Sequence, residues 1–262
     1  MSERKRMPSY RPWGSTEDGA IEFESLTTQT LNGALKVIRE SFFTCENVCL
    51  GVDLLSEPGA AEELEQLCLE AASDGVSVVA IDVNTQEVVG VAFNKLHGQQ
   101  DPSVKGNFEK FSENCKYKSS KALVDFMINV DSRINLFEHY NAACLLEIMF
   151  LATLQNYTKR RIGELLVSSS LELARQLYCG NAVKTAVEIN CNSILTNVNA
   201  IPSLVTAIMT SNYSQKISSK LGFDCLVIVS FDEFTFNGKK FSERIGSIHK
   251  TSRLVAKRLS KK

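Results

Sequence analysis

The chain lacks the features that mark several large classes of protein. No uninterrupted apolar run approaches the roughly 18 residues that a membrane-spanning helix needs. The nearest run, Cys144 to Leu154, is interrupted by Glu147. The basic residues near the start, Met1-Ser-Glu-Arg-Lys-Arg6, are not followed by the apolar stretch of a secretory signal. We therefore expect no membrane partner and a cytoplasmic location.

Metal-binding residues are few and scattered. The sequence has three histidines and eight cysteines, and no two cysteines form a Cys-x-x-Cys pair. Because a zinc site needs clustered ligands at short spacings, we predict no metal, and we interpret the cysteines as reduced, partly buried small side chains. The net charge of the 262 residues is −1, with an isoelectric point of about 6.3. This balance argues against nucleic acid as a partner.

What is present is an ordinary globular composition, with 44% hydrophobic and 23% charged residues and no internal repeat. Residues 1–19 are polar and contain two prolines and two glycines, which predicts a flexible N-terminal arm. Residues 20–262 are predicted to form a single domain. Apolar and polar residues alternate from Ala20 to Leu26, which is typical of a strand, and Thr27 or Thr28 can cap the helix that follows.

Strands and helices interleave along the rest of the chain. Apolar runs predict strands at residues 76–82, 87–94, 144–153, 204–209, 225–231 and, as an edge strand, 252–256. Helical spacing of apolar residues predicts helices at 58–73, 121–140, 162–177 and 212–221. Residues 98–120 are expected to form an exposed insertion. The predicted class is α/β (α+β) with a mixed sheet.

The most informative stretch joins the buried strand ending at Thr153 to the helix beginning at Ile162. Lys159, Arg160 and Arg161 place three cations just before that helix. A helix N-terminus has unpaired N–H groups and about half a positive charge. The turn is therefore suited to an anion, most plausibly a pyrophosphate. A solvated basic turn is the alternative.

This stretch resembles motif A of the GNAT acyl-CoA N-acyltransferases, from Leu151-Ala-Thr through Tyr157 to Arg160-Arg-Ile-Gly163. The family pattern is a Gln or Arg, two residues, Gly, one residue, and Gly or Ala. Gly163 fills the last position, whereas Arg161 replaces the middle glycine and Thr158 the leading residue. The Cβ of Arg161 can hold the loop away from the phosphates, while its guanidinium can reach one of them.

Further segments are similar to insect arylalkylamine N-acetyltransferase-like enzymes. They are residues 76–94, residues 207–223 with their Leu-Gly-Phe ending, and residues 231–259, so that the likeness runs from about residue 21 to 259. The resemblance implies the GNAT fold, a central mixed, mostly antiparallel sheet of six to seven strands flanked by helices. The sheet would be splayed between residues 145–153 and 204–209.

The resemblance also implies acetyl-CoA as co-substrate. The pantetheine arm would lie in the splay and pair with the backbone of Leu151, Ala152 and Thr153, which needs only N–H and C=O groups. The pyrophosphate would lie on the turn and the first helical residues. The positions implied for the nucleotide are Thr158, Lys159, Arg160, Arg161, Ile162, Gly163 and Glu164.

A general base is valuable to such an enzyme, because an alkylamine of pKa near 10.4 is neutral in only about one molecule in 2,500 at pH 7. The family has a glutamate in Phe-Phe-x-Asp-Glu-Pro-Leu. Here Phe42-Phe-Thr-Cys-Glu-Asn-Val48 brings Glu46 to that position, with Cys45 for the Asp and Asn47 for the Pro. Two alternatives stay open. Glu46 can be a surface residue, or Glu147, whose carboxylate within an apolar run needs a partner, can be a second base or proton relay.

The departing CoA thiolate calls for a hydroxyl near the start of the last helix. Many GNAT enzymes use a tyrosine, and Ser218 stands where it would be. The insect branch has two hydroxyl residues four apart, which Thr210 and Ser214 match. Of these we favour Ser214, with Tyr213 in reserve. Thr210 can instead belong to the helix cap.

The sequence therefore favours an acetyl-CoA-dependent N-acetyltransferase acting on a small primary amine, either an arylalkylamine or a polyamine-like compound. Direct attack in a ternary complex is expected, because no cysteine has the setting of an acyl-accepting nucleophile. The alternatives are an acyltransferase for protein amines or longer acyl chains, and a degenerate fold kept as a binding module. We expect a monomer.

Overall fold

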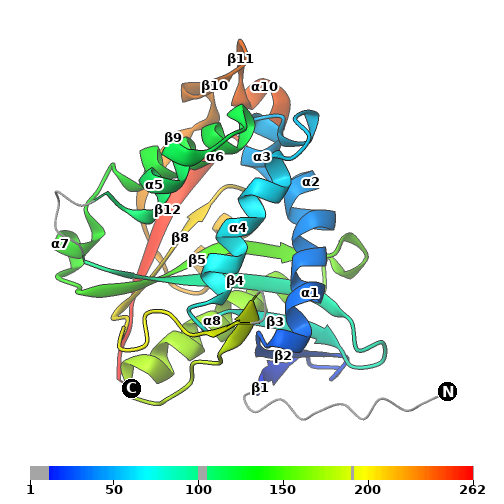
Figure 1. The fold of residues 1–262 in the computed structure, drawn as a ribbon, viewed down its shortest axis with the longest axis vertical. Helices are drawn as coiled ribbons and strands as arrows, with labels where there is room; N and C mark the ends of the chain where they lie inside the picture. Colours follow the sequence, from blue (N-terminus) through cyan, green and yellow to red (C-terminus); the bar gives the residue numbers. More distant parts are fainter. Residues whose placement is uncertain (1–11, 100–104, 190–191, 262) are drawn as a thin grey trace.

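A computed structural model describes residues 12–99, 105–189 and 192–261. An eight-stranded sheet runs through its centre in the spatial order β1–β2–β3–β4–β5–β8–β12–β9 (Figure 1). Its strands are β1 (Pro12–Ser15), β2 (Ile21–Ser25), β3 (Val78–Asp82), β4 (Val88–Gly98), β5 (Cys144–Thr153), β8 (Leu204–Met209), β9 (Asp224–Ser230) and β12 (Thr251–Arg258). Neighbouring strands are antiparallel except β5 and β8, which are parallel. The predicted mixed, mostly antiparallel sheet is confirmed.

Helices cover both faces of the sheet (Figure 1). They are α1 (Thr28–Val37), α2 (Phe43–Cys45), α3 (Asn47–Gly51), α4 (Ala60–Ala72), α5 (Asn107–Asn114), α6 (Lys118–Asp131), α7 (Leu136–Tyr140), α8 (Ile162–Tyr178), α9 (Asn212–Lys220) and α10 (Phe241–Ile245). One apolar cluster packs α1, α4 and α6 against one face, and a second packs α8 and α9 against the other. Two small hairpins, β6 (Val187–Ile189) with β7 (Asn192–Ile194) and β10 (Thr235–Phe236) with β11 (Lys239–Lys240), lie outside the main sheet.

Strands β5 and β8 part soon after they meet. Their pairing covers Leu145 with Leu204, Leu146 with Val205 and Glu147 with Thr206, and ends there within the described residues. On its other side, β5 stays paired with β4 as far as Thr153. One backbone edge of residues 148–153 therefore faces an opening, which we call the splay. The predicted splay between these two strands is confirmed.

Strand β1 corrects the predicted flexible arm and the predicted strand number. Residues 12–15 pair with β2, and the indole N–H of Trp13 donates to Ser25 Oγ at 3.0 Å. This strand makes eight instead of six to seven. Strand β1 is too short to show an alternation of apolar and polar residues in the sequence, so that only its pairing with β2 identifies it as a strand. Residues 1–11 of the predicted arm lie outside the described residues.

Two further predictions about the fold are wrong. The segment 252–256 is not an edge strand, because β12 lies between β8 and β9 and pairs with both. The single helix predicted for 121–140 is two helices, α6 and α7. Asn135 separates them, because its side chain accepts the N–H groups of Phe137 and Glu138 and so starts a new helix. The helical spacing of apolar residues continues across this break.

Candidate active site

The chain between α1 and α3 spans the splay. Thr27 caps α1 in a capping box with Thr30, and α1 continues into a π-helical turn, Ile38–Phe42, before α2 and α3. Ser41 Oγ donates to the carbonyl of Thr153 at the end of β5, at 2.7 Å. Asn47 Nδ2 donates to the carbonyl of Thr210, just beyond β8, at 2.8 Å. We call residues 38–51 the bridging segment, since its side chains bond to both strands of the splay.

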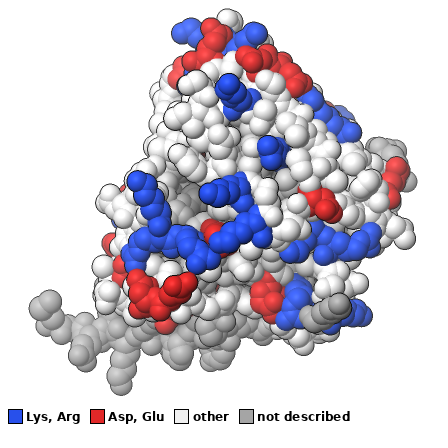
Figure 2. Space-filling model, turned by 180° about the vertical axis from the view of Figure 1, so that it is seen from behind, with Lys and Arg blue, Asp and Glu red and all other residues white. Residues whose placement is uncertain are grey.

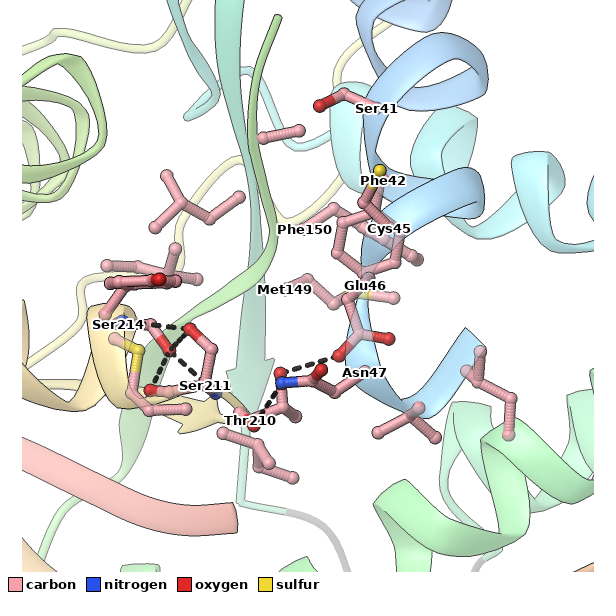
Figure 3. A pocket seen from close by; sticks show the side chains of 18 of the residues that line it. Ser41, Phe42, Cys45, Glu46, Asn47, Met149, Phe150, Thr210, Ser211 and Ser214 are labelled. Atoms are coloured by element: carbon pink, nitrogen blue, oxygen red, sulfur yellow. Dashed lines mark hydrogen bonds between the residues drawn. The ribbon is translucent and has the colours of Figure 1, made fainter. Parts of the chain in front are cut away.

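Glu46 lies in the middle of the bridging segment and is only partly buried. It is the N-cap of α3, and its Oε2 accepts the backbone N–H of Cys49 at 2.8 Å. Its Oε1 accepts the hydroxyl of Thr210 at 2.6 Å (Figure 3). Both carboxylate oxygens are therefore fixed, one by its own helix and one by the far side of the splay. The structure thus joins two of the residues predicted to be catalytic.

A cavity of about 360 Å³ lies at the splay, near the lower end of the range usual for small-molecule sites. Glu46 is the one carboxylate among its described lining residues, which include no Lys or Arg. Many of the other lining residues are aromatic or aliphatic. They include Phe42, Leu67, Phe108, Leu123, Val124, Met127, Met149 and Phe150.

The hydroxyls near α9 divide into two kinds. Ser211 is the N-cap of α9, and its hydroxyl and that of Ser214 lie 3.0 Å apart in a capping box. Ser214 lines the cavity, but its hydroxyl also donates to the Ser211 carbonyl. Thr210 precedes the cap and makes no bond within it among the described contacts. The cap interpretation that we held open for Thr210 applies instead to Ser211 and Ser214.

Two more predicted hydroxyls lie at different depths. Tyr213 lines the mouth of the cavity, is 71% exposed, and has its ring 5.3 Å from that of His249. Ser218 is buried, donates to the Gln215 carbonyl at 2.9 Å, and is not among the lining residues. His249 Nδ1 accepts the backbone N–H of Asn212 at 3.1 Å, and the residue also lines the cavity.

Glu147 occupies a different environment from Glu46. It is 4% exposed, its Oε2 lies 2.8 Å from His97 Nε2, and it is not among the described lining residues of the cavity. Burial, reinforced by the charge of Glu147, holds the pKa of the nearby Asp131 carboxyl well above its usual range. Glu147 therefore lies against the His97 imidazole, away from the described lining of the cavity.

The cysteines near the cavity differ in exposure. Burial raises the pKa of the Cys49 thiol, and the charge of Glu46 raises it further, so that this thiol stays protonated. Cys45 is exposed at the cavity, with Gln155 Nε2 3.2 Å from its sulfur. No cluster of three or more metal-ligating side chains occurs among the residues that the structure describes.

The turn before α8 has an unusual backbone. Lys159 and Arg161 adopt positive φ angles of 64° and 62°, and Arg161 is the N-cap of α8, with no side chain capping the helix in this described stretch. Positive φ is readily adopted by glycine and costs other residues roughly 1–2 kcal/mol. Arg161 thus adopts a backbone conformation that favours glycine, which is the residue of the family pattern at this position. The N–H groups of Ile162, Gly163 and Glu164 begin the helix without intrahelical acceptors.

The two arginines of this turn are paired with acidic residues. Arg161 donates to Glu164 at 2.7 Å and lies 3.4 Å from Glu17, while Arg160 lies 3.5 Å from Asp18. Lys220 of α9 reaches the same Glu164 at 2.8 Å, and the Arg161 and Lys220 bonds hold the pKa of this carboxyl below its usual range. Figure 2 shows basic side chains gathered around a hollow on the face that carries α8. The turn is a cationic rim beside the splay.

The predicted nucleotide residues fall into two groups. Leu151, Ala152, Thr153 and Thr158 line the cavity. The remaining positions, 159–164, form the turn and the first helical residues next to it. Sequence reasoning missed the roles of Ser41 and Asn47. A buried polar side chain needs a hydrogen-bond partner, but the neighbouring sequence does not show which residue that is. The partner of Ser41 lies 112 residues away in the chain, and the partner of Asn47 lies 163 residues away.

This sheet, splayed between one parallel pair and flanked by helices, is the fold of the GNAT acetyltransferases. The chain is similar to the crystal structure of arylalkylamine N-acetyltransferase 2 from Aedes aegypti, with a TM-score of 0.71 and 20% identity over 92% of this chain and 99% of that one. It is also similar to a putative arylalkylamine N-acetyltransferase 7 from Aedes aegypti, with a TM-score of 0.72 and 17% identity over 99% and 98% of the two chains.

A third similar structure is a polyamine N-acetyltransferase from Drosophila melanogaster that catalyses the formation of N-acetylagmatine. Its TM-score is 0.68 at 13% identity, over 91% of this chain and all of that one. No protein-family model matches the sequence, and no curated protein matches it. The predicted resemblance to the insect enzymes is thus confirmed at the level of the fold. None of the described helices is long and apolar enough to cross a membrane.

Proposed function

We propose that this chain is an acetyl-CoA-dependent N-acetyltransferase whose acceptor is a small primary amine. The observation that carries the proposal is the 2.6 Å bond between the Glu46 carboxylate and the Thr210 hydroxyl, made at the wall of a cavity in the splay. A carboxylate and a hydroxyl in one cavity are the pair needed to take a proton from an amine and return one to a thiolate.

Acetyl-CoA fits the opposite side of the same cavity. The free edge of β5 offers backbone groups of Leu151 and Thr153 to a pantetheine arm, and both residues line the cavity. The first N–H groups of α8 and the guanidinium of Arg160 offer donors to a pyrophosphate. For this contact, Arg160 would exchange its weak, exposed pairing with Asp18, at 3.5 Å, for the phosphate.

The reaction follows from these positions. Glu46 accepts a proton from the bound ammonium group, and the freed nitrogen attacks the acetyl carbonyl carbon. The carbon–sulfur bond then breaks, the nitrogen releases its second proton to solvent, and the CoA thiolate takes a proton from the Thr210 hydroxyl. Thr210 recovers that proton from Glu46, to which it is already bonded. No acyl-enzyme forms in this sequence, in line with a ternary complex.

The lining favours an arylalkylamine over a polyamine. A second ammonium or guanidinium group desolvated in the cavity needs a second carboxylate, and Glu46 is the one carboxylate among the described lining residues. The rings of Phe42 and Phe150 lie 5.1 Å apart in an edge-to-face contact beside Glu46, and offer apolar surface to an aromatic substrate (Figure 3).

The test is a thiol-release assay with acetyl-CoA and a panel of acceptors: phenylethylamine, putrescine, agmatine and a short peptide with a free N-terminus. We expect turnover that is fastest with phenylethylamine. Turnover of the peptide alone, or with a longer acyl-CoA alone, would favour the protein-amine or longer-chain acyltransferase. Calorimetric binding of acetyl-CoA without turnover of any amine would favour a binding module and overturn the enzyme proposal.

A further inference from the structure

Asn47 makes a contact that the family pattern does not contain. Its side chain is buried, with 5% of the residue exposed, and its amide donates to the carbonyl of Thr210 at 2.8 Å. A proline, which the resemblance places at this position, has no side-chain donor. The contact across the splay at Asn47 is therefore a property of this chain.

Thr210 is held twice from the bridging segment. Its hydroxyl donates to Glu46, and its carbonyl accepts from the neighbouring Asn47 (Figure 3). Two bonds from adjacent residues to two atoms of one residue fix both its position and its orientation. Without the amide, Thr210 is held from this side by its hydroxyl alone, the same group that the proposed reaction uses.

We infer that Asn47 is a positioning residue that keeps the Glu46 carboxylate and the Thr210 hydroxyl in one arrangement. The inference rests on the proposed function for its effect on the rate. Asn47 acts through Thr210 and Glu46, and it takes no part in proton transfer. Ser41 anchors the other end of the bridging segment to Thr153 in the same manner, so that Glu46 lies between two fixed points.

Three variants test the inference. Asn47→Ala removes the amide. Asn47→Asp keeps the shape, removes the donor and adds a second carboxylate beside Glu46. Thr44→Ala is the control, because Thr44 lies in the same segment but is exposed, and its hydroxyl donates to the carbonyls of Glu40 and Ser41 within that segment. The measurements are kcat, both KM values, the pH profile of kcat/KM and an NMR spectrum of the ¹³C-labelled carboxyl group of Glu46 at a fixed pH.

We expect Asn47→Ala to lower kcat roughly three- to tenfold, the effect of one lost hydrogen bond, with an unchanged KM for acetyl-CoA. Asn47→Asp should lower kcat by at least as much, because it lacks the same donor. In Asn47→Ala the ¹³C carboxyl signal of Glu46 should shift or broaden at fixed pH, because the carboxylate is no longer held in one arrangement. Thr44→Ala should match wild type in each measurement.

Wild-type kcat in Asn47→Ala, or a Glu46 carboxyl signal with the wild-type chemical shift and line width in Asn47→Ala, would overturn the inference. The NMR signal needs no turnover, so that it still decides the matter if wild type acetylates no amine and the proposed function fails. If Asn47→Ala does not fold, Asn47→Asp, which matches the native side chain in volume, carries the test.

Discussion

Replacing Glu46 by glutamine is the most direct test of the proposed chemistry. The amide has the shape of the carboxylate and can keep its two contacts, accepting from the Cys49 N–H and donating to the Thr210 hydroxyl oxygen. Alanine would also remove the N-cap of α3, which costs about 1 kcal/mol of stability. A loss of activity could then not be told apart from a loss of folded protein. Glu46→Gln therefore removes the proton acceptor and leaves the bridging segment in place.

The expected loss can be stated in numbers. An amine of pKa near 10.4 must lose its proton at pH 7, which costs about 4.6 kcal/mol at about 1.36 kcal/mol per pH unit. A positioned general base typically raises the rate about 10²- to 10⁴-fold by offsetting part of this cost. We expect Glu46→Gln to lower kcat/KM at pH 7 by a factor in that range. Acetyl-CoA binding should change little, because Glu46 faces the acceptor.

The pH dependence separates a lost base from a damaged site. Without Glu46 the enzyme depends on amine that solvent has already deprotonated, and this fraction rises about tenfold per pH unit until the pH nears 10.4. The kcat/KM of Glu46→Gln should therefore climb through alkaline pH, while wild type reaches its plateau at lower pH. The measurement is initial-rate thiol release at saturating acetyl-CoA between pH 6 and 10.

Glu147→Gln is the comparison variant, since Glu147 is a buried carboxylate that does not line the cavity. We expect its kcat/KM to stay within a few-fold of wild type. Near-wild-type activity in Glu46→Gln together with loss of activity in a folded Glu147→Gln would refute the reasoning and make Glu147 the base. If neither variant slows the reaction, a chain of water molecules removes the proton.

Three further predictions concern binding and stability. Replacing Arg160 and Arg161 together by alanine should raise the KM for acetyl-CoA about tenfold or more and leave the amine KM nearly unchanged; equal acetyl-CoA affinity in calorimetry would remove the phosphate assignment. Arg161→Gly should melt about 2–4 °C above Arg161→Ala, since both lack the guanidinium and only glycine takes φ of 62° without strain; equal melting temperatures would contradict this. Asp131→Asn should raise the melting temperature at pH 7. Burial and the charge of Glu147 raise the pKa of Asp131, so that the stabilising contribution of the wild-type carboxyl is full below about pH 4 and is lost as the pH rises. A gain in the variant's melting temperature that persists at pH 3 would contradict the assigned cause.

The elements that the sequence predicted best carry a strong local pattern. The continuous apolar run 144–153 and the run 204–209 have the bounds of β5 and β8. The amphipathic period that predicts 162–177 ends one residue before α8 does. Strand β12 was misjudged because alternation indicates two differing faces of a strand, while its place within a sheet depends on which strands flank it.

The residues of the site could be predicted from the sequence only in part, for the same reason. Glu46 could be proposed because residues 42–48 resemble a family segment, but the choice between Thr210 and Ser214 depends on which hydroxyl the helix cap uses. Thr210, Ser211 and Ser214 are all suitable near a helix start, and local chemistry does not rank them. Tertiary structure decides, because Glu46 reaches Thr210 from 164 residues away, while Ser211 and Ser214 satisfy each other.

The departures from the family pattern bear on whether this chain is an enzyme or a degenerate binding module. A degenerate site would be expected to lose the geometry that the pattern preserves. Here Arg161 adopts a positive φ of 62°, which glycine takes without strain, and its guanidinium bonds to Glu164 at the start of α8. Asn47 replaces a proline and adds a bond to the same Thr210 that Glu46 contacts. Both substitutions are thus accompanied by compensating contacts around an intact carboxylate–hydroxyl pair. These contacts are the reason why we favour catalysis over binding alone.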